Sequence, residues 1–198
     1  MVTRSVKIGA AVVAGAIVAA VAFKLGSSTV DSPKQTVATQ TTGTTATAPN
    51  LIEFRSDKSG WAISYPKDWE RHEADPSDHD VALIVSAGDG RGSIKIRDID
   101  LGAPVEEGKQ RALTDQLVNT QGIQPITQPA PIRQAGLPGT FYFYSFKDPT
   151  SGSEGVHSHY FLFKGPRLII IVFQALPKDD FPRLAGLYDA VIGSFRVL

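Results

Sequence analysis

The hydrophobic positions divide the chain into three unlike parts. Residues 8–23 form an uncharged, mostly apolar run between Lys7 and Lys24, residues 26–50 contain no Leu, Ile or aromatic residue, and every aromatic residue except Phe23 lies after position 50. Because aromatic side chains supply much of the core of a small domain, we expect one folded domain over residues 51–198. The pattern predicts an N-terminal signal anchor or signal peptide over 1–25 and a disordered Thr/Ser-rich linker over 26–50.

Short runs with apolar residues at every second position predict strands in the first half of the domain. They cover residues 52–55 and 61–65, and then 81–87 and 93–99. The last two runs are joined by a glycine-rich link of five residues. A link of that length connects antiparallel neighbours, so we expect a hairpin there.

Two helices and four further strands are predicted after position 100. Pro104 and Gly122 mark the ends of the first helix, and a broad apolar face marks a second helix that begins near Asp179 or Asp180. Because several strands are apolar on both faces, we predict an α+β fold in which a central antiparallel sheet is covered on both sides. The four strands are expected at residues 132–135, 140–146, 156–164 and 167–174.

The apolar run at 8–23 has the form of an export segment, with Arg4 and Lys7 before it. As a helix it would span roughly 24 Å, slightly less than the hydrocarbon core of a bilayer. This length leaves open a retained transmembrane anchor and a cleaved signal peptide, and a buried Ala/Val helix of a soluble protein is a third interpretation. We favour the anchor because a long linker follows it. The basic residues before the run predict a cytoplasmic N-terminus and a domain outside the cytoplasm.

The charge and the cysteine content exclude several classes of function and of chemical site. Residues 51–198 hold 16 basic and 19 acidic residues, a formal net charge of −3, so the domain has no positive field that would gather nucleic acid. The chain has no cysteine, which excludes disulfides, thiolate metal ligands, a thiol nucleophile and a lipid-modified cysteine as anchor.

Three segments carry a resemblance to a known family. They are GWAISYPKDW at 60–69, the aromatic strand at 139–146 and the C-terminal stretch that ends in IGSFR at 192–196. Together they resemble the PsbP-like superfamily, which includes an extrinsic subunit of photosystem II and a Ran-binding relative. The resemblance covers about residues 51–198. It implies an α/β/α sandwich around an antiparallel sheet of about six strands, in a bacterial, exported, membrane-anchored member that docks on partners rather than catalysing a reaction.

All four histidines fall in two places. His157 and His159 form an HxH pair on a predicted strand, where both side chains point to one face and could share a metal ion. Further ligands are available in the loop at 72–80. The alternative interpretation is that the two rings simply pack on a half-exposed strand. The loop offers His72, Glu73, Asp75, Asp78, His79 and Asp80.

Other motifs favour structure over chemistry. The glycines at 88–92 lead into a strand rather than into a helix N-terminus, so we interpret them as a hairpin turn and not as a phosphate loop. Ser151 and Ser153 lie in a link between strands, not in a nucleophile elbow. Asp148 and Glu154 in the same link could chelate calcium loosely, but a turn explains them better. Trp61, Tyr65 and Trp69 are expected in the core, with an aromatic docking surface as the alternative.

The sequence therefore predicts a non-enzymatic, extracytoplasmic, membrane-tethered domain that docks on a protein or envelope component. It predicts no cofactor and no nucleic-acid partner. The expected location is the cell membrane, with a single pass and the C-terminal domain outside, or secretion if the N-terminal segment is cleaved. One alternative is a carrier or sensor for a small hydrophobic ligand held between sheet and helix, and another is a metal-dependent hydrolase that uses His157 and His159.

Overall fold

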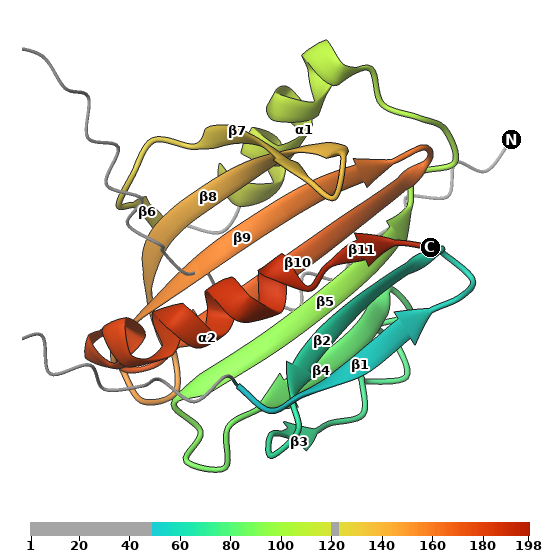
Figure 1. Cartoon of the computed structure of the whole chain (residues 1–198). Helices are drawn as coiled ribbons and strands as arrows, with labels where there is room; N and C mark the ends of the chain where they lie inside the picture. Colours follow the sequence, from blue (N-terminus) through green and yellow to red (C-terminus); the bar gives the residue numbers. More distant parts are fainter. Residues whose placement is uncertain (1–48, 120–122) are drawn as a thin grey trace, which may run out of the picture.

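The structure is a computed structural model that describes residues 49–119 and 123–198 (Figure 1). The predicted N-terminal segment and the linker up to residue 48 lie outside the described residues, so these two predictions stand as predictions. In the described part of the chain, no helix is both long and apolar enough to cross a membrane.

A central antiparallel sheet forms the middle layer of the domain (Figure 1). The six strands predicted after residue 80 are all present in it, with two-residue strands added at its edges. All pairings between its strands are antiparallel. The order is β3 (Glu70–Arg71), β4 (Val81–Ser86), β5 (Gly92–Asp100), β10 (Arg167–Ala175), β9 (Glu154–Lys164), β8 (Leu137–Lys147) and β6 (Gln124–Pro125), and β7 (Ala130–Gln134) also pairs with β8.

The first two predicted strands belong to a second, smaller sheet. β1 (Leu51–Ser56) and β2 (Trp61–Pro66) form a hairpin, and β11 (Arg196–Val197) pairs with the other edge of β2. The alternation of apolar residues marks both β1 and β2 correctly, but it carries no information about which sheet a strand joins.

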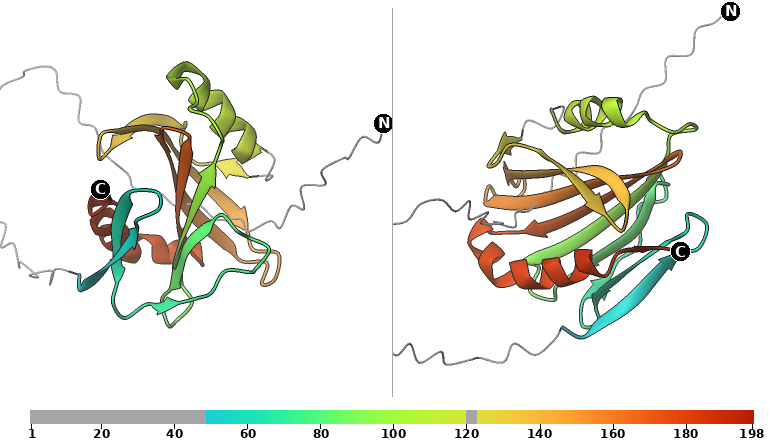
Figure 2. Two further views of the ribbon diagram at one scale, coloured as in Figure 1. Left: turned by 90° about the vertical axis from the view of Figure 1, so that its right-hand side faces the viewer. Right: turned by 45° about the horizontal axis from the view of Figure 1, so that its top comes forward.

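One helix lies on each face of the central sheet (Figure 2). α2 (Phe181–Gly193) follows a short 3-10 helix at Lys178–Asp180 and shares its face with the small sheet, and α1 (Glu107–Asn119) lies on the other face. Alternate residues of a strand reach opposite faces, so Ile169 of β10 packs on the α2 side and Leu168 on the α1 side. The predicted α+β class, with a helix on each face of an antiparallel sheet, is confirmed.

A buried carboxylate joins the two sheets. Asp98 of β5 is 8% exposed. Its Oδ2 accepts a hydrogen bond from Trp61 Nε1 of β2 at 2.9 Å, and its Oδ1 accepts one from Arg167 Nε of β10 at 2.8 Å. Trp61 is fully buried and packs against the rings of Phe54 and Phe195. This Asp98 clamp, made of Asp98, Trp61 and Arg167, therefore holds the small sheet through its largest core side chain.

Replacing Asp98 by Ala should lower the free energy of unfolding by about 1–3 kcal/mol, because it leaves the buried indole N–H of Trp61 without an acceptor. Arg167 would keep its ion pair with Asp100. Urea unfolding followed by circular dichroism measures the change. Glu53→Ala is the control: Glu53 pairs with Arg196 on the exposed side of the small sheet, so its loss should matter far less. Equal losses in the two variants would contradict a special role for the clamp.

Candidate docking surface

The predicted histidine pair lies inside the domain. His157 and His159 are on β9 and both point to the α1 side of the central sheet, as their spacing predicts. They are 0% and 6% exposed. His157 Nε2 donates a hydrogen bond to Gln174 Oε1 at 2.7 Å, and His159 Nδ1 is hydrogen-bonded to the Tyr144 hydroxyl at 3.0 Å.

Aromatic rings enclose both imidazoles. Phe146 stacks on His157 with ring centroids 4.0 Å apart, and Phe161 stacks on His159 at 4.5 Å. His157 Nδ1 is buried and has no hydrogen-bond partner among the described residues. These contacts favour the structural interpretation, in which the two rings are part of the core on the α1 side.

The loop expected to supply further metal ligands lies at the opposite edge of the sheet. It follows β3, and three strands, β4, β5 and β10, separate β3 from the histidines on β9. Its side chains bond locally instead: His72 Nε2 lies 2.7 Å from Ser86 Oγ, and Asp78 forms ion pairs with Lys95 and Arg97. Within residues 49–119 and 123–198, no three His, Asp or Glu side chains gather as a metal site would require. A metal bound by the histidine pair stays a prediction.

The other candidate residues have structural surroundings. The glycine-rich link turns β4 into β5, with Gly90 at a φ of +70°. Asp148 accepts hydrogen bonds from the backbone N–H and the hydroxyl of Ser151, and so stabilises its own turn. Trp61 and Trp69 are 0% and 9% exposed, as expected for core residues, whereas Tyr65 is half-buried and packs at the edge of the core.

The layer between the central sheet and α2 is closely packed. Leu184, Tyr188 and Val191 of α2 are buried in it, and the Tyr188 hydroxyl donates to the carbonyl of Gln174 at 2.5 Å. At Gly92 of β5, an added Cβ would lie 2.8 Å from that hydroxyl, so glycine permits the close approach. These contacts leave no room at this point for the small ligand that the carrier hypothesis placed between sheet and helix.

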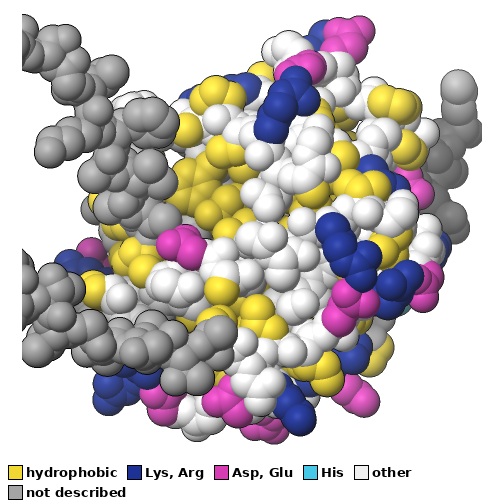
Figure 3. All heavy atoms as spheres, in the orientation of Figure 1, with side chains coloured by type: hydrophobic (Ala, Val, Ile, Leu, Met, Phe, Trp, Pro, Cys, Tyr) yellow, Lys and Arg dark blue, Asp and Glu magenta, His cyan; other side chains and the backbone are white. Residues whose placement is uncertain are grey.

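α2 leaves part of its own face of the sheet uncovered. It packs on β10 and β2, whereas β8 and β9 carry aromatic residues on this face. Phe141 and Tyr160 are cross-strand neighbours with ring centroids 4.9 Å apart, and Phe143 lies 6.3 Å from Phe181 of α2. Ile132 of β7 extends the surface. Phe143 is 8% exposed and the other four are half-buried. In Figure 3, hydrophobic side chains gather on this side of the molecule. We call these five residues the aromatic face.

Two polar groups of described elements border the aromatic face. Gln134 Nε2 of β7 donates to the carbonyl of Ile192 at 2.8 Å, which joins the β7–β8 hairpin to α2 at one end of the face. Asp189 of α2 lies at its side. Burial, together with the charge of Asp189, raises the pKa of Tyr160 to about 12, so the phenol stays neutral at physiological pH.

Sequence reasoning missed the aromatic face. The run FYFYSF in β8 is apolar at consecutive positions, which predicts a strand covered on both sides. The structure meets that prediction on the α1 side, where Tyr142 and Tyr144 are 3% and 0% exposed. On the α2 side Phe143 is 8% exposed, whereas Phe141 is only half-buried. Which side a helix leaves open depends on where the helix lies, and no local pattern carries that information.

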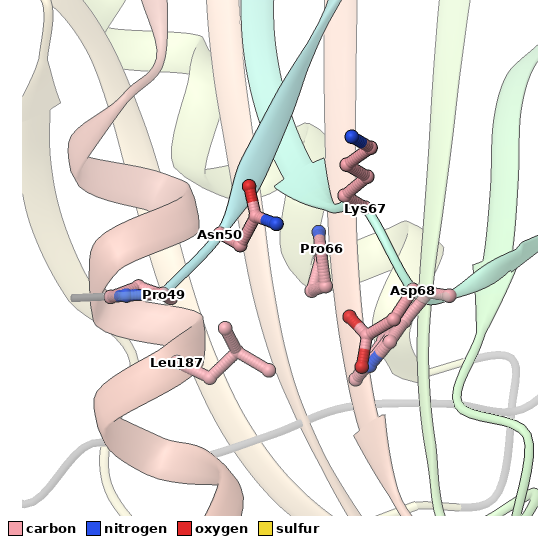
Figure 4. Close-up of a pocket in the computed structure, with 7 residues that line it drawn as sticks. Pro49, Asn50, Pro66, Lys67, Asp68 and Leu187 are labelled. Atoms are coloured by element: carbon pink, nitrogen blue, oxygen red, sulfur yellow. The ribbon is translucent and has the colours of Figure 1, made fainter. Parts of the chain in front are cut away.

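A groove also lies between α2 and the start of the small sheet. It has a volume of about 640 Å³. Figure 4 shows Leu187 projecting from α2 toward the segment that holds Pro66 and Asp68. Pro49 and Asn50, the first described residues, form another wall. The groove lies outside the packed layer beneath α2, at the point where the linker joins the domain.

Comparison with known proteins shows that the chain is similar in fold to several solved structures. No protein-family model matches the chain, and no curated protein matches it. Among solved structures, LpqN of Mycobacterium tuberculosis, described as involved in cell envelope biogenesis, is 11% identical with a TM-score of 0.51, over 75% of this chain and 91% of that one. A Bacteroides thetaiotaomicron protein is 14% identical with a TM-score of 0.49, over 74% of this chain, which spans only 48% of that protein.

Two further structures belong to the groups that the sequence resembles. The cyanobacterial PsbP protein of Synechocystis sp. PCC 6803 is 14% identical, with a TM-score of 0.48 over 78% of this chain and 96% of that one. The Ran-binding protein Mog1p of Saccharomyces cerevisiae is 10% identical, with a TM-score of 0.46 over 76% of this chain and 96% of that one. At these identities the likeness concerns the fold alone. The comparison with LpqN thus shows a shared fold, and membership of the PsbP-like superfamily stays a prediction.

The buried histidines should make the domain acid-sensitive. Burial lowers the pKa of His159 from 6.5 to about 3, and burial together with the neighbouring His159 lowers that of His157 well below 6.5. For both histidines the pKa in the folded state lies below the pKa in the unfolded state. The folded domain therefore has its full stability above about pH 6.5 and becomes less stable as the pH falls below that value. Each histidine should then lower the free energy of unfolding by up to about 1.4 kcal/mol for every pH unit.

Urea unfolding between pH 7.5 and 5, above the range where most carboxylates titrate, measures this loss. The double variant His157→Phe, His159→Phe is the matched comparison, and its unfolding midpoint should change much less with pH even though it starts lower. The same pH dependence in both proteins would show that the histidines are not its source.

Proposed function

We propose that this chain is a non-enzymatic, membrane-tethered domain outside the cytoplasm that binds a protein through the aromatic face. The observation that supports the proposal is the pair of half-buried rings of Phe141 and Tyr160 on β8 and β9, next to the buried Phe143 and beside α2. Contiguous apolar surface of this kind on a soluble domain marks an interaction site. Aromatic side chains are also the residues that contribute most to protein–protein binding.

The surroundings of the aromatic face support binding better than catalysis. The two imidazoles that burial keeps neutral, His157 and His159, lie on the opposite side of the central sheet, enclosed by aromatic rings. Tyr160, on the face itself, stays a neutral phenol whose hydroxyl is hydrogen-bonded to Ser158, so its ring can contribute to an apolar contact. Such a combination suits an interface core.

The tether is part of the proposal. The apolar run at 8–23 and the linker of 26–50 would hold the domain close to the membrane, with a mean reach on the order of 30 Å for a flexible linker of this length. The role described for LpqN, in cell envelope biogenesis, agrees with an envelope location but belongs to that protein. For this chain the support is the form of the N-terminal sequence.

Retention of the N-terminal segment predicts that the mature chain keeps residues 8–23. Mass spectrometry of the protein purified from membranes of its native host measures the mature N-terminus. A start near Phe23 would refute the anchor and leave a secreted domain.

Partner binding at the aromatic face predicts a position-specific crosslink. A photoreactive benzophenone amino acid at Phe141 replaces one aromatic ring by another, so the fold should be kept. Irradiation of cells that express the full chain should give one reproducible crosslinked protein.

The control places the same photoreactive residue at Gln116, an exposed position of α1 on the other face of the sheet. It should not give that product. If Phe141 and Gln116 give the same products, or if Phe141 gives none, the aromatic face is not the docking site.

A further inference from the structure

The side of α2 that borders the aromatic face carries one acidic residue. Phe181, Ala185 and Asp189 are spaced by four, so they lie along one side of the helix. Phe181 contacts Phe143 of the sheet at one end of this stripe, and the charge of Asp189 acts on Tyr160 further along it. Asp189 is therefore placed at the edge of the aromatic face.

Asp189 has no cationic partner of its own. Among the described residues, none forms an ion pair or a hydrogen bond with its carboxylate. Asp180, one residue before the same helix, shows the contrast, because it pairs with Arg91 at 3.3 Å and Arg183 at 3.5 Å. Asp189 is an exposed residue, yet desolvation of its carboxylate by the neighbouring chain raises its pKa above the ordinary value. A cation brought to this place would compensate that charge.

The combination of rings and a lone carboxylate selects among binding partners. A Lys or Arg side chain would pair with Asp189 and could also lie against the electron-rich face of Tyr160. A phosphate-bearing lipid headgroup would be repelled by the same carboxylate. Charge complementarity thus favours a basic protein segment over an anionic membrane surface.

We propose that the aromatic face binds a partner protein segment that presents apolar side chains together with a Lys or Arg, and that this cation pairs with Asp189. The inference rests on the proposed function and names the chemistry of the partner. The apolar side chains of the segment cover Phe141, Phe143 and Tyr160. The ion pair then forms next to a dry surface, where it fixes the orientation of the segment.

The test measures the crosslink from the benzophenone residue at Phe141 in the full chain, in a background that carries Asp189→Lys. Because Asp189 is exposed and near the C-terminal end of α2, Lys there is compatible with the helix. Circular dichroism of each purified variant verifies the fold. The matched control is Glu73→Lys, which makes the same charge change at an exposed loop position that has no ion pair among the described residues.

The expected result is a crosslink yield at least about tenfold lower in Asp189→Lys and unchanged in Glu73→Lys. Mass spectrometry of the wild-type product should map the crosslink to a partner peptide that contains a Lys or Arg. Reversal of that residue to Glu in the partner should restore the crosslink to Asp189→Lys.

Other outcomes overturn the inference. An undiminished crosslink in Asp189→Lys, a crosslinked peptide without a basic residue, or a failed charge reversal would each contradict the ion pair while leaving docking at the aromatic face intact. A product that is a lipid, a second copy of this chain or its own residues 1–48 would contradict a partner protein altogether. The absence of any product from Phe141 would instead refute the proposed function.

Discussion

The contact between Asp98, Trp61 and Arg167 determines how the layers of this domain are placed. It fastens β2 of the small sheet to β5 and β10 of the central sheet. β11, the last strand, pairs with β2, and α2 is joined directly to β11 by the short segment that holds Phe195. The position of α2 thus follows from the position of the small sheet. Packed against β10 and β2, the helix reaches β8 through Phe181, which contacts Phe143, and it leaves Phe141 and Tyr160 half-buried.

The two faces of the central sheet have opposite properties as a consequence. On the α1 side, polar groups are enclosed: His157 and His159 are hydrogen-bonded and stacked within aromatic rings. On the α2 side, apolar rings are left half-exposed beside a carboxylate without a partner. Enclosed imidazoles contribute to stability and make it depend on pH, whereas open aromatic rings lower solubility unless they serve in binding. The histidines thus lie on a side of the sheet that aromatic rings enclose, and the candidate interface lies on the α2 side.

Most of the secondary structure could be predicted because it depends on local signals. The strand from Arg167 to Ala175 is predicted at 167–174, and the last helix, predicted to begin near Asp179 or Asp180, begins at Phe181. The site could be predicted only in part. The HxH spacing correctly placed His157 and His159 on one side of a strand, because side chains of a strand alternate. Whether that side is open depends on Phe146 and Phe161, whose positions follow from strand pairing.

The sequence by itself determined the α+β class, most of the strands and helices, the absence of cysteine chemistry and the small negative charge of the domain. Net charge and cysteine content are sums over the residues, and strands and helices follow from short-range periodicity. All of them can therefore be obtained from the sequence directly. Only the tertiary structure decided that the first hairpin forms a separate sheet, that Asp98 is buried between residues 37 and 69 positions away, and that Phe141 and Tyr160 stay half-exposed beside Asp189. Each of these depends on contacts between distant segments, and such contacts are set by the packing of whole layers rather than by any local pattern.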